Sequence, residues 1–315
     1  MVEAILITVG VLLVLCAAIT VYAYFAAFHI SNKRKANPPE LPTGEQYLPY
    51  RENTIRLVAD MRAYPTERIE IRSADGVRLS ARYFHVRDGA PVEIQFHGYR
   101  SNPIYDFCGG SELTRARGYN AILVDQRSHG ESEGNVISFG LRERYDVKAW
   151  AEYAAERFGK DCPVVLTGVS MGAATVLMAS ALPLPENVVG IIADCPYSSP
   201  KAVIRKVCRD MHFPVSVTYP FIRLGARLLG GFSLTEEGAV DAVRESRVPI
   251  LILHGEDDRF VPCEMSREIA KAAPDKVRLE TFPGAGHALS YMVDPVRYRR
   301  VTAEFLQSCV NAKRS

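Results

Sequence analysis

An apolar run rich in valine that meets a Gly-x-Ser-x-Gly pattern constrains this chain more than any other feature. Residues 164–174 read Val-Val-Leu-Thr-Gly-Val-Ser-Met-Gly-Ala-Ala. Gly168 and Gly172 leave room for a strand to turn sharply into a helix, with Ser170 held in a strained backbone at the turn. The helix start behind Ser170 offers unpaired N–H groups and the positive end of the helix dipole. The pattern predicts a nucleophile elbow, and the alternative interpretation is a loop serine flanked by glycines.

Short apolar runs alternate with helical stretches along the chain. Strands that alternate with helices predict an α/β fold with a mostly parallel central sheet and helices on both faces. Ligands then gather at the carboxyl ends of the strands. The 315 residues are 48% hydrophobic, which is enough for one such core. We expect a hairpin over 68–73 and 77–86, strands over 92–96, 121–125, 164–166, 188–193, 249–253 and 277–282, and helices over 105–117, 140–158, after Pro262 and over 294–309.

The N-terminal segment is long and apolar. Residues 4–28 carry no charge, and a helix needs about 20 such residues to cross a bilayer. We expect a single-pass transmembrane helix over 4–30 and a proline-rich linker over 31–46. A cleaved signal peptide is the alternative, but no Lys or Arg precedes the apolar run, which is longer than usual for a signal.

Two features predict on which side of the membrane the rest of the chain lies. Lys33, Arg34 and Lys35 follow the apolar span, and the positive-inside rule places that side in the cytoplasm. The seven cysteines are odd in number and scattered, which fits free thiols in a reducing compartment. We therefore expect a membrane protein whose globular domain is cytoplasmic.

One stretch interrupts the alternation of strands and helices. Residues 196–247 show helical patterns without a strand, and they are rich in aromatic and aliphatic side chains. We expect a globular domain over 47–315 in which the 196–247 insertion covers the ligand site as a lid. A pair of packing helices with no gating role is the alternative.

A serine nucleophile needs a base, and the base needs an acid that orients it. His287 follows the expected 277–282 strand on a small-residue loop, from which a base reaches an elbow serine. The acid should lie between the serine and the histidine in chain order, at the end of a strand. Asp258 is one candidate, and Asp257 and Asp194 are the alternatives.

Five motifs, in this order, give the chain a resemblance to a known family. They are His97-Gly98-Tyr99-Arg100-Ser101-Asn102, Asp125-Gln126-Arg127-Ser128-His129-Gly130-Glu131-Ser132, the elbow at 168–172, residues 254–262, and Gly286-His287. Over residues 67–310 the chain resembles the α/β-hydrolase superfamily, in its serine aminopeptidase-like and monoglyceride-lipase-like branch.

The resemblance implies a role for several residues. Asp258 takes the fifth position of the family pattern HGxxDxxVP, which is the acid, and the backbone N–H groups of Tyr99 and Met171 form the oxyanion hole. The chain departs from the family's D-x-R-G-H-G loop at Ser128, which replaces a glycine. That loop is structural in the family, so His129 is expected to be a packing residue, and so are His97 and His254.

Together these residues predict a serine hydrolase that cleaves carboxylic esters, lipid-derived esters among them, by an acyl-enzyme mechanism. The alternatives are a peptidase or aminopeptidase of the same fold and a non-catalytic binding scaffold, against which the intact Ser170, Asp258 and His287 set argues. A dehalogenase would need an aspartate at position 170.

The expected partners are a small-molecule or lipid ester and, through the N-terminal helix, a membrane. Nothing requires a metal or organic cofactor, and a net charge of +2 without a basic stripe gives no reason to expect nucleic acid. The sequence gives no indication of the oligomeric state.

Overall fold

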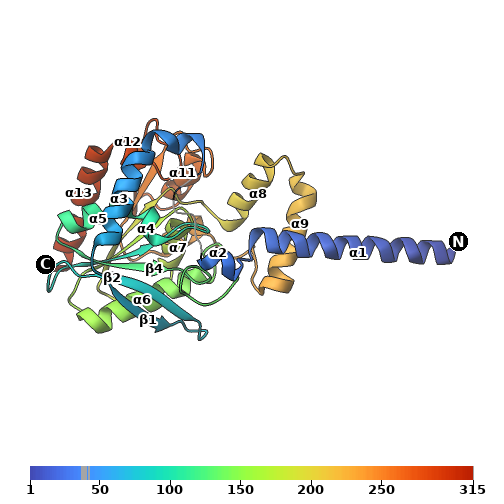
Figure 1. Ribbon diagram of the computed structural model, residues 1–315, viewed down its shortest axis with the longest axis horizontal. Coiled ribbons are helices and arrows are strands. Elements are labelled where there is room, and N and C mark those ends of the chain that lie inside the picture. Colours follow the sequence, from blue (N-terminus) through green and yellow to red (C-terminus); the bar gives the residue numbers. More distant parts are fainter. Residues whose placement is uncertain (37–40, 42, 315) are drawn as a thin grey trace.

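A central sheet organises the protein (Figure 1). The computed structural model describes residues 1–36, 41 and 43–314. Among these residues the sheet has eight strands in the order β1-β2-β4-β3-β5-β6-β7-β8. Strands β3 to β8 are parallel, whereas β2 pairs antiparallel with both β1 and β4. The strands are β1 (Glu67–Arg72), β2 (Arg78–Phe84), β3 (Val92–Phe96), β4 (Asn120–Asp125), β5 (Val164–Val169), β6 (Val188–Asp194), β7 (Ile250–Gly255) and β8 (Val277–Phe282). The predicted α/β fold with a mostly parallel sheet is confirmed.

Helices cover both faces of the sheet. Successive side chains of a strand point to opposite faces, and in β6 Ile191 joins the core cluster that includes α7, whereas Ile192 joins the cluster that includes α13. The helices of the globular body are α3 (Arg51–Ala63), α4 (Pro103–Asp106), α5 (Cys108–Ala116), α6 (Glu143–Phe158), α7 (Met171–Ala179), α11 (Cys263–Ala272), α12 (Ser290–Val293) and α13 (Pro295–Arg314), with a 3₁₀ turn η1 (Glu45–Tyr50).

Two local predictions differ from the structure. The helix expected over 105–117 is divided into α4 and α5, because Phe107 has a non-helical backbone (φ −110°, ψ 15°). The helix α3 was not predicted. Its sequence is polar overall, and it buries a narrow stripe that includes Leu57, Val58 and Met61.

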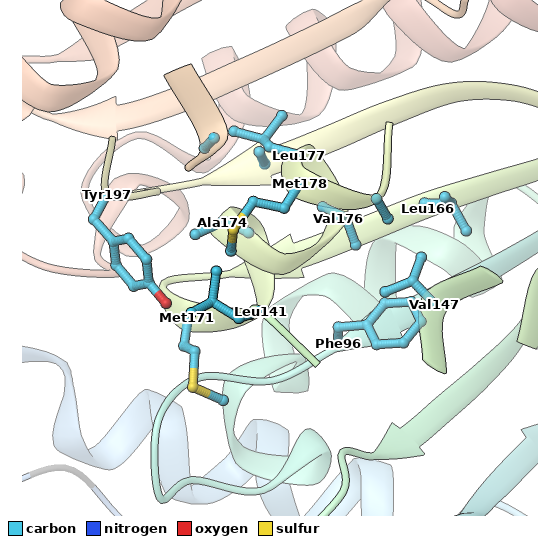
Figure 2. Packing of buried hydrophobic residues seen from close by; sticks show 14 of the residues in the cluster. Phe96, Leu141, Val147, Leu166, Met171, Ala174, Val176, Leu177, Met178 and Tyr197 are labelled. Atoms are coloured by element: carbon cyan, nitrogen blue, oxygen red, sulfur yellow. The ribbon is translucent and has the colours of Figure 1, made fainter. Parts of the chain in front are cut away.

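The helix that follows the Gly-x-Ser-x-Gly pattern lies in the middle of the core. Every residue of α7 is buried, and Figure 2 shows α7 side chains in one cluster with Phe96 and Leu166. The backbone of Gly172 lies so close to β3 that an added Cβ would be 1.9 Å from the Phe96 carbonyl oxygen. The second glycine of the pattern is therefore required by helix–strand contact.

Gly172→Ala is expected to lower the free energy of unfolding by roughly 2 kcal/mol or more, because the atoms that its Cβ meets are backbone atoms that cannot rotate away. Gly110→Ala in α5 is the matched control. Its Cβ would make ordinary contact at 3.4 Å with Phe107, so we expect a small change or a gain, as for most glycines within helices. Thermal unfolding of the two variants measures the difference, and equal stabilities would refute the packing argument.

The N-terminal helix α1 (Val2–Ala27) projects from the globular body (Figure 1). Among the described residues it is the one helix long and apolar enough to cross a membrane, with a mean hydropathy of 2.9. The helix ends at Ala27, three residues before the predicted boundary at residue 30, because residues 28–30 pack into the globular body. Phe28 is fully buried, with edge-to-face ring contacts to Phe139 and Phe232, and the Ile30 N–H donates to the Asn135 carbonyl at 3.0 Å.

The expected linker over 31–46 is only partly described. Residues 37–40 and 42, which include three of its prolines, lie outside the described residues. Before them, a short helix α2 (Asn32–Ala36) places Lys35 where its ammonium donates to the Ser132 and Gly134 carbonyls. The chain therefore stays on the body for several residues after α1.

The insertion between β6 and β7 is helical. Residues 196–247, all of which the structure describes, contain helices and turns and no strand. They form α8 (Pro200–Asp210), α9 (Val215–Gly225), a π-helical turn η2 (Ala226–Gly230), α10 (Ala239–Ala242) and a 3₁₀ turn η3 (Val243–Glu245). Helices α8 and α9 stand out from the body beside α1 (Figure 1).

Candidate active site

Ser170 lies at the sharp turn between β5 and α7. Its backbone has φ +54° and ψ −114°, a combination that costs a non-glycine residue energy and persists only when the surrounding structure enforces it. Here the Ser170 N–H donates to the Asp194 carbonyl at 2.8 Å, and the two glycines of the pattern allow the close packing. The turn presents the Ser170 hydroxyl at the carboxyl edge of the sheet.

A chain of hydrogen bonds joins the three residues predicted as a triad. His287 Nε2 lies 3.0 Å from Ser170 Oγ, and His287 Nδ1 lies 2.6 Å from Asp258 Oδ2. In the tautomer that fits both contacts, Nδ1 donates to the carboxylate and Nε2 accepts from the hydroxyl. All three side chains are buried. The structure thus brings together a serine, a histidine and an aspartate that lie far apart in the sequence.

Asp258 is held as a carboxylate. Burial alone would raise its pKa, but hydrogen bonds from His254 and His287 outweigh burial and hold the pKa well below its ordinary value. Its other oxygen, Oδ1, accepts the backbone N–H groups of Phe260 and Val261 at 2.9 and 2.8 Å. A charged, fully bonded carboxylate of this kind fixes the imidazole and stabilises its protonated form.

The two alternative acids lie in different surroundings. Asp257 is exposed. Asp194 is buried, and its carboxylate oxygens accept from Ser290 Oγ at 3.5 Å and Tyr298 Oη at 3.1 Å. Burial raises the Asp194 pKa to about 6. Neither carboxylate is hydrogen-bonded to His287 in the structure.

The loop after β3 passes directly over Ser170. A Cβ built on Gly98 would lie 3.4 Å from the Ser170 Cβ, so the next residue, Tyr99, is in reach of a group bound to that serine. The Gly98 N–H donates to Asp106 Oδ2 at 2.6 Å, and Ser101 Oγ donates to Asp106 Oδ1 at 2.7 Å. Met171 is the first residue of α7, and its N–H has no acceptor within the helix.

Comparison with known proteins places the chain in a family. The model of the alpha/beta hydrolase family matches residues 96–301. The chain belongs to the alpha/beta hydrolase family.

Curated relatives within the alpha/beta hydrolases are distant. The uncharacterized protein YqkD of Bacillus subtilis is 24% identical over 239 residues, which cover 76% of this chain and 78% of YqkD. Human ABHD12B is 28% identical over 228 residues, which cover 63% of this chain and 56% of ABHD12B.

Solved alpha/beta hydrolase structures share the fold. Esterase Pf2001 of Pyrococcus furiosus superimposes with a TM-score of 0.66 at 20% identity, over 88% of this chain and 98% of the esterase. Est1E of Butyrivibrio proteoclasticus, solved with bound ferulic acid, superimposes with a TM-score of 0.61 at 20% identity, over 77% of this chain and 99% of Est1E.

The loop that contains Ser128 packs against the loop that follows β3. Ser128 has φ +68°, in the left-handed region that favours the glycine of the family pattern named above. Ser128 Oγ donates to the Val136 carbonyl at 2.8 Å. His129 Nε2 accepts the Arg100 backbone N–H at 3.0 Å, and His97 Nδ1 donates to the Gly98 carbonyl at 2.8 Å. Burial lowers the pKa of His97 to about 4 and that of His129 well below its ordinary value.

An apolar cavity of about 520 Å³ leads to Ser170. That volume is in the range of small-molecule sites. Among the described residues that line it there is no aspartate or glutamate, and the one charged side chain is that of Arg100. The walls come from α1, the loops after β3 and β7, and the insertion helices α8 and α9.

A buried cysteine lies beside the triad. The metal-binding atoms of Cys195, Asp258 and His287 lie within 4.8 Å of one another. Burial raises the pKa of the Cys195 thiol well above its ordinary value, whereas a metal ligand must be a thiolate. The imidazole and the carboxylate are also bonded to each other, so this group fits the Ser170 hydrogen-bond chain better than a metal site.

Asp106, Cys195 and the end of α1 were not predicted as parts of the site. Asp106 lies on a short helix with no motif around it. Cys195 follows β6 directly, which is the one signal that could have placed it at this edge of the sheet.

Proposed function

We propose that the protein is a membrane-anchored serine hydrolase that cleaves carboxylic esters, lipid-derived esters among them. The observation that carries the proposal is the Ser170–His287–Asp258 hydrogen-bond chain at the end of an apolar cavity. The hydrolase family and the esterases among its structural neighbours support this reaction class.

The reaction begins with the serine hydroxyl. Ser170 Oγ attacks the ester carbonyl while His287 Nε2 takes the hydroxyl proton, and Asp258 stabilises the imidazolium that forms. His287 then gives the proton to the leaving alkoxide, which departs as the alcohol. A water molecule, deprotonated in turn by His287, attacks the acyl-enzyme. The bond to Ser170 Oγ then breaks, the acid is released, and His287 returns the proton to Ser170 Oγ.

Backbone N–H groups stabilise the negative charge that develops on the carbonyl oxygen. We assign this role to Tyr99 and Met171, because Tyr99 follows Gly98, which lies against Ser170, and Met171 begins α7 directly after Ser170. Asp106 is a positioning residue that holds this loop through the Gly98 N–H.

The cavity favours esters over peptides with a free amino terminus. An aminopeptidase must pair the ammonium group of its substrate, because a buried unpaired charge is costly. The described residues that line the cavity provide no carboxylate for that purpose. The apolar lining fits an acyl chain instead.

Burial at the end of α1 supports an anchor that is retained. Tyr24, Phe28 and Ile30 belong to the main hydrophobic core, so removal of the segment would expose core surface. Lys33, Arg34 and Lys35 follow the span and favour a cytoplasmic domain. We assign residues 4–30 to the anchor and its docked end, and 196–247 to a lid over the cavity in the 47–315 domain.

A fluorophosphonate probe and a substrate panel test the proposal on the full chain. We expect the probe to label the wild-type protein and not Ser170→Ala. We also expect the wild-type protein to hydrolyse p-nitrophenyl esters and to release no p-nitroaniline from amino-acid p-nitroanilides. Labelling of neither protein would favour the binding scaffold, and turnover of the anilides alone would favour the peptidase.

A further inference from the structure

The membrane-anchor helix lines the cavity that contains Ser170. Five residues of α1 contribute to the wall: Ile19, Tyr22, Ala23, Ala26 and Ala27. Their spacing of three, four, seven and eight residues places them on one face of the helix. Most of α1 projects from the globular body, and the face that lines the cavity is at its C-terminal end (Figure 1).

Hydrogen bonds fix the end of α1 to the loop over Ser170. Tyr99 Oη donates to the Ala27 carbonyl at 2.7 Å, and the Arg100 guanidinium donates to the Ala26 carbonyl at 3.0 Å and the His29 carbonyl at 2.7 Å. The last carbonyls of a helix have no partner within it, so these bonds satisfy the end of the anchor. The position of the wall relative to Ser170 is therefore set by direct contacts.

The lid forms the opposite wall, and it packs on the same anchor. Helix α9 crosses α1 where α1 leaves the body (Figure 1). At Gly225 an added Cβ would lie 3.0 Å from both the Thr20 carbonyl oxygen and the Tyr24 Cβ. The anchor and the lid thus form one unit around the cavity.

The outer surface of this unit suits the interface of a bilayer. Phe25 is 51% exposed on α1, and Val217, Leu228 and Leu229 of the lid are 56%, 67% and 46% exposed. Residues 200–230 carry six Lys and Arg and one acidic side chain. Apolar side chains among basic ones are typical of elements that lie in the membrane interface.

We propose that α1 is the bilayer-facing wall of an acyl-chain pocket, and that the substrate is a single-chain amphiphilic ester whose chain enters from the bilayer between α1 and the lid. This inference rests on the proposed ester hydrolysis. The ester carbonyl reaches Ser170 while the chain lies along Ala23, Ala26 and the apolar lid residues. A cavity of about 520 Å³ that Ser170 lines has room for one such chain.

Bulk at Ala26 tests the wall. Ala26 is exposed, so its replacement leaves the core intact, and it lines the cavity. In Ala26→Trp we expect the ratio of kcat/KM for p-nitrophenyl palmitate to kcat/KM for p-nitrophenyl butyrate to fall about tenfold or more, because the indole takes the space of the long chain. The full chain is assayed in one detergent at one micelle concentration.

Ala17→Trp is the matched control. Ala17 is exposed on the same helix and does not line the cavity. It lies nine residues earlier, about two and a half turns, on the opposite face. We expect its palmitate-to-butyrate ratio to equal that of the wild type.

The outcomes separate the two proposals. Wild-type protein that hydrolyses neither ester overturns the proposed function, and this inference with it. Wild-type hydrolysis with an unchanged ratio in Ala26→Trp, or with an equal fall in Ala17→Trp, overturns the inference alone. Thermal unfolding shows whether Ala26→Trp folds, and if it does not, Ala26→Leu provides the same test with a smaller expected fall.

Discussion

Replacement of Ser170 by alanine should lower kcat for ester hydrolysis about 10⁴-fold or more. The Ser170 side chain is hydrogen-bonded to His287 at 3.0 Å, and the variant has no hydroxyl at this position for His287 to deprotonate. The loss is expected for every ester, long or short, because it concerns the bond that forms with the substrate. Initial rates with p-nitrophenyl butyrate measure it.

The fold should tolerate Ser170→Ala. The strained turn is fixed by backbone contacts, namely the Ser170 N–H to the Asp194 carbonyl and the close packing of Gly168 and Gly172. We expect thermal unfolding close to that of the wild type. A folded variant that keeps a tenth or more of the wild-type rate would show that another residue is the nucleophile.

Asp258→Asn should lower kcat almost as far, about 10⁴-fold. The oxygen of the introduced amide can keep the N–H groups of Phe260 and Val261, which now bind Oδ1 of the carboxylate. The amide NH₂ would then face His287 Nδ1, where the carboxylate now accepts at 2.6 Å. The amide therefore favours the His287 tautomer that carries its proton on Nε2, the nitrogen that faces Ser170. An imidazole in that tautomer cannot accept the serine proton.

Two aspartates in the same region give the controls for Asp258→Asn. Asp257→Asn changes an exposed side chain, and Asp194→Asn keeps an oxygen that can accept from Tyr298. We expect both variants to retain most of the wild-type kcat, because neither carboxylate is hydrogen-bonded to His287. A larger loss in either variant than in Asp258→Asn would reassign the acid.

The parts of the fold that follow from local pattern could be predicted from the sequence. Residues 277–282 form a strand with the predicted bounds, because apolar and polar side chains alternate there between turn signals. The mostly parallel sheet follows from the regular alternation of strands with helices, whereas the order of the strands was not predicted. In contrast, α3 has a polar sequence, and it folds as a helix on the body because of a buried stripe that local propensity does not reveal.

For the candidate site, the residues that belong to a sequence motif could be predicted. The residues that reach the site only through tertiary packing could not. Ser170 follows β5 directly, and Asp258 and His287 lie in the loops after β7 and β8, so the fold brings all three to the same edge of the sheet. Asp106 reaches the Gly98 N–H from a four-residue helix, which depends on the break at Phe107. The contact of α1 with Tyr99 depends on how two distant surfaces meet, and no local signal records it.

The docking of residues 28–30 has a consequence for where the protein can work. Because Phe28 is fixed in the core and Ile30 is bonded to the body, the segment with the predicted linker begins after the anchor is already attached. If α1 is the membrane anchor, as proposed, these contacts would hold the serine at a constant height above the leaflet in which the anchor ends. The proposed enzyme would then act in cis, and its rate on a lipid ester should follow the mole fraction of that ester in its own membrane rather than the bulk concentration.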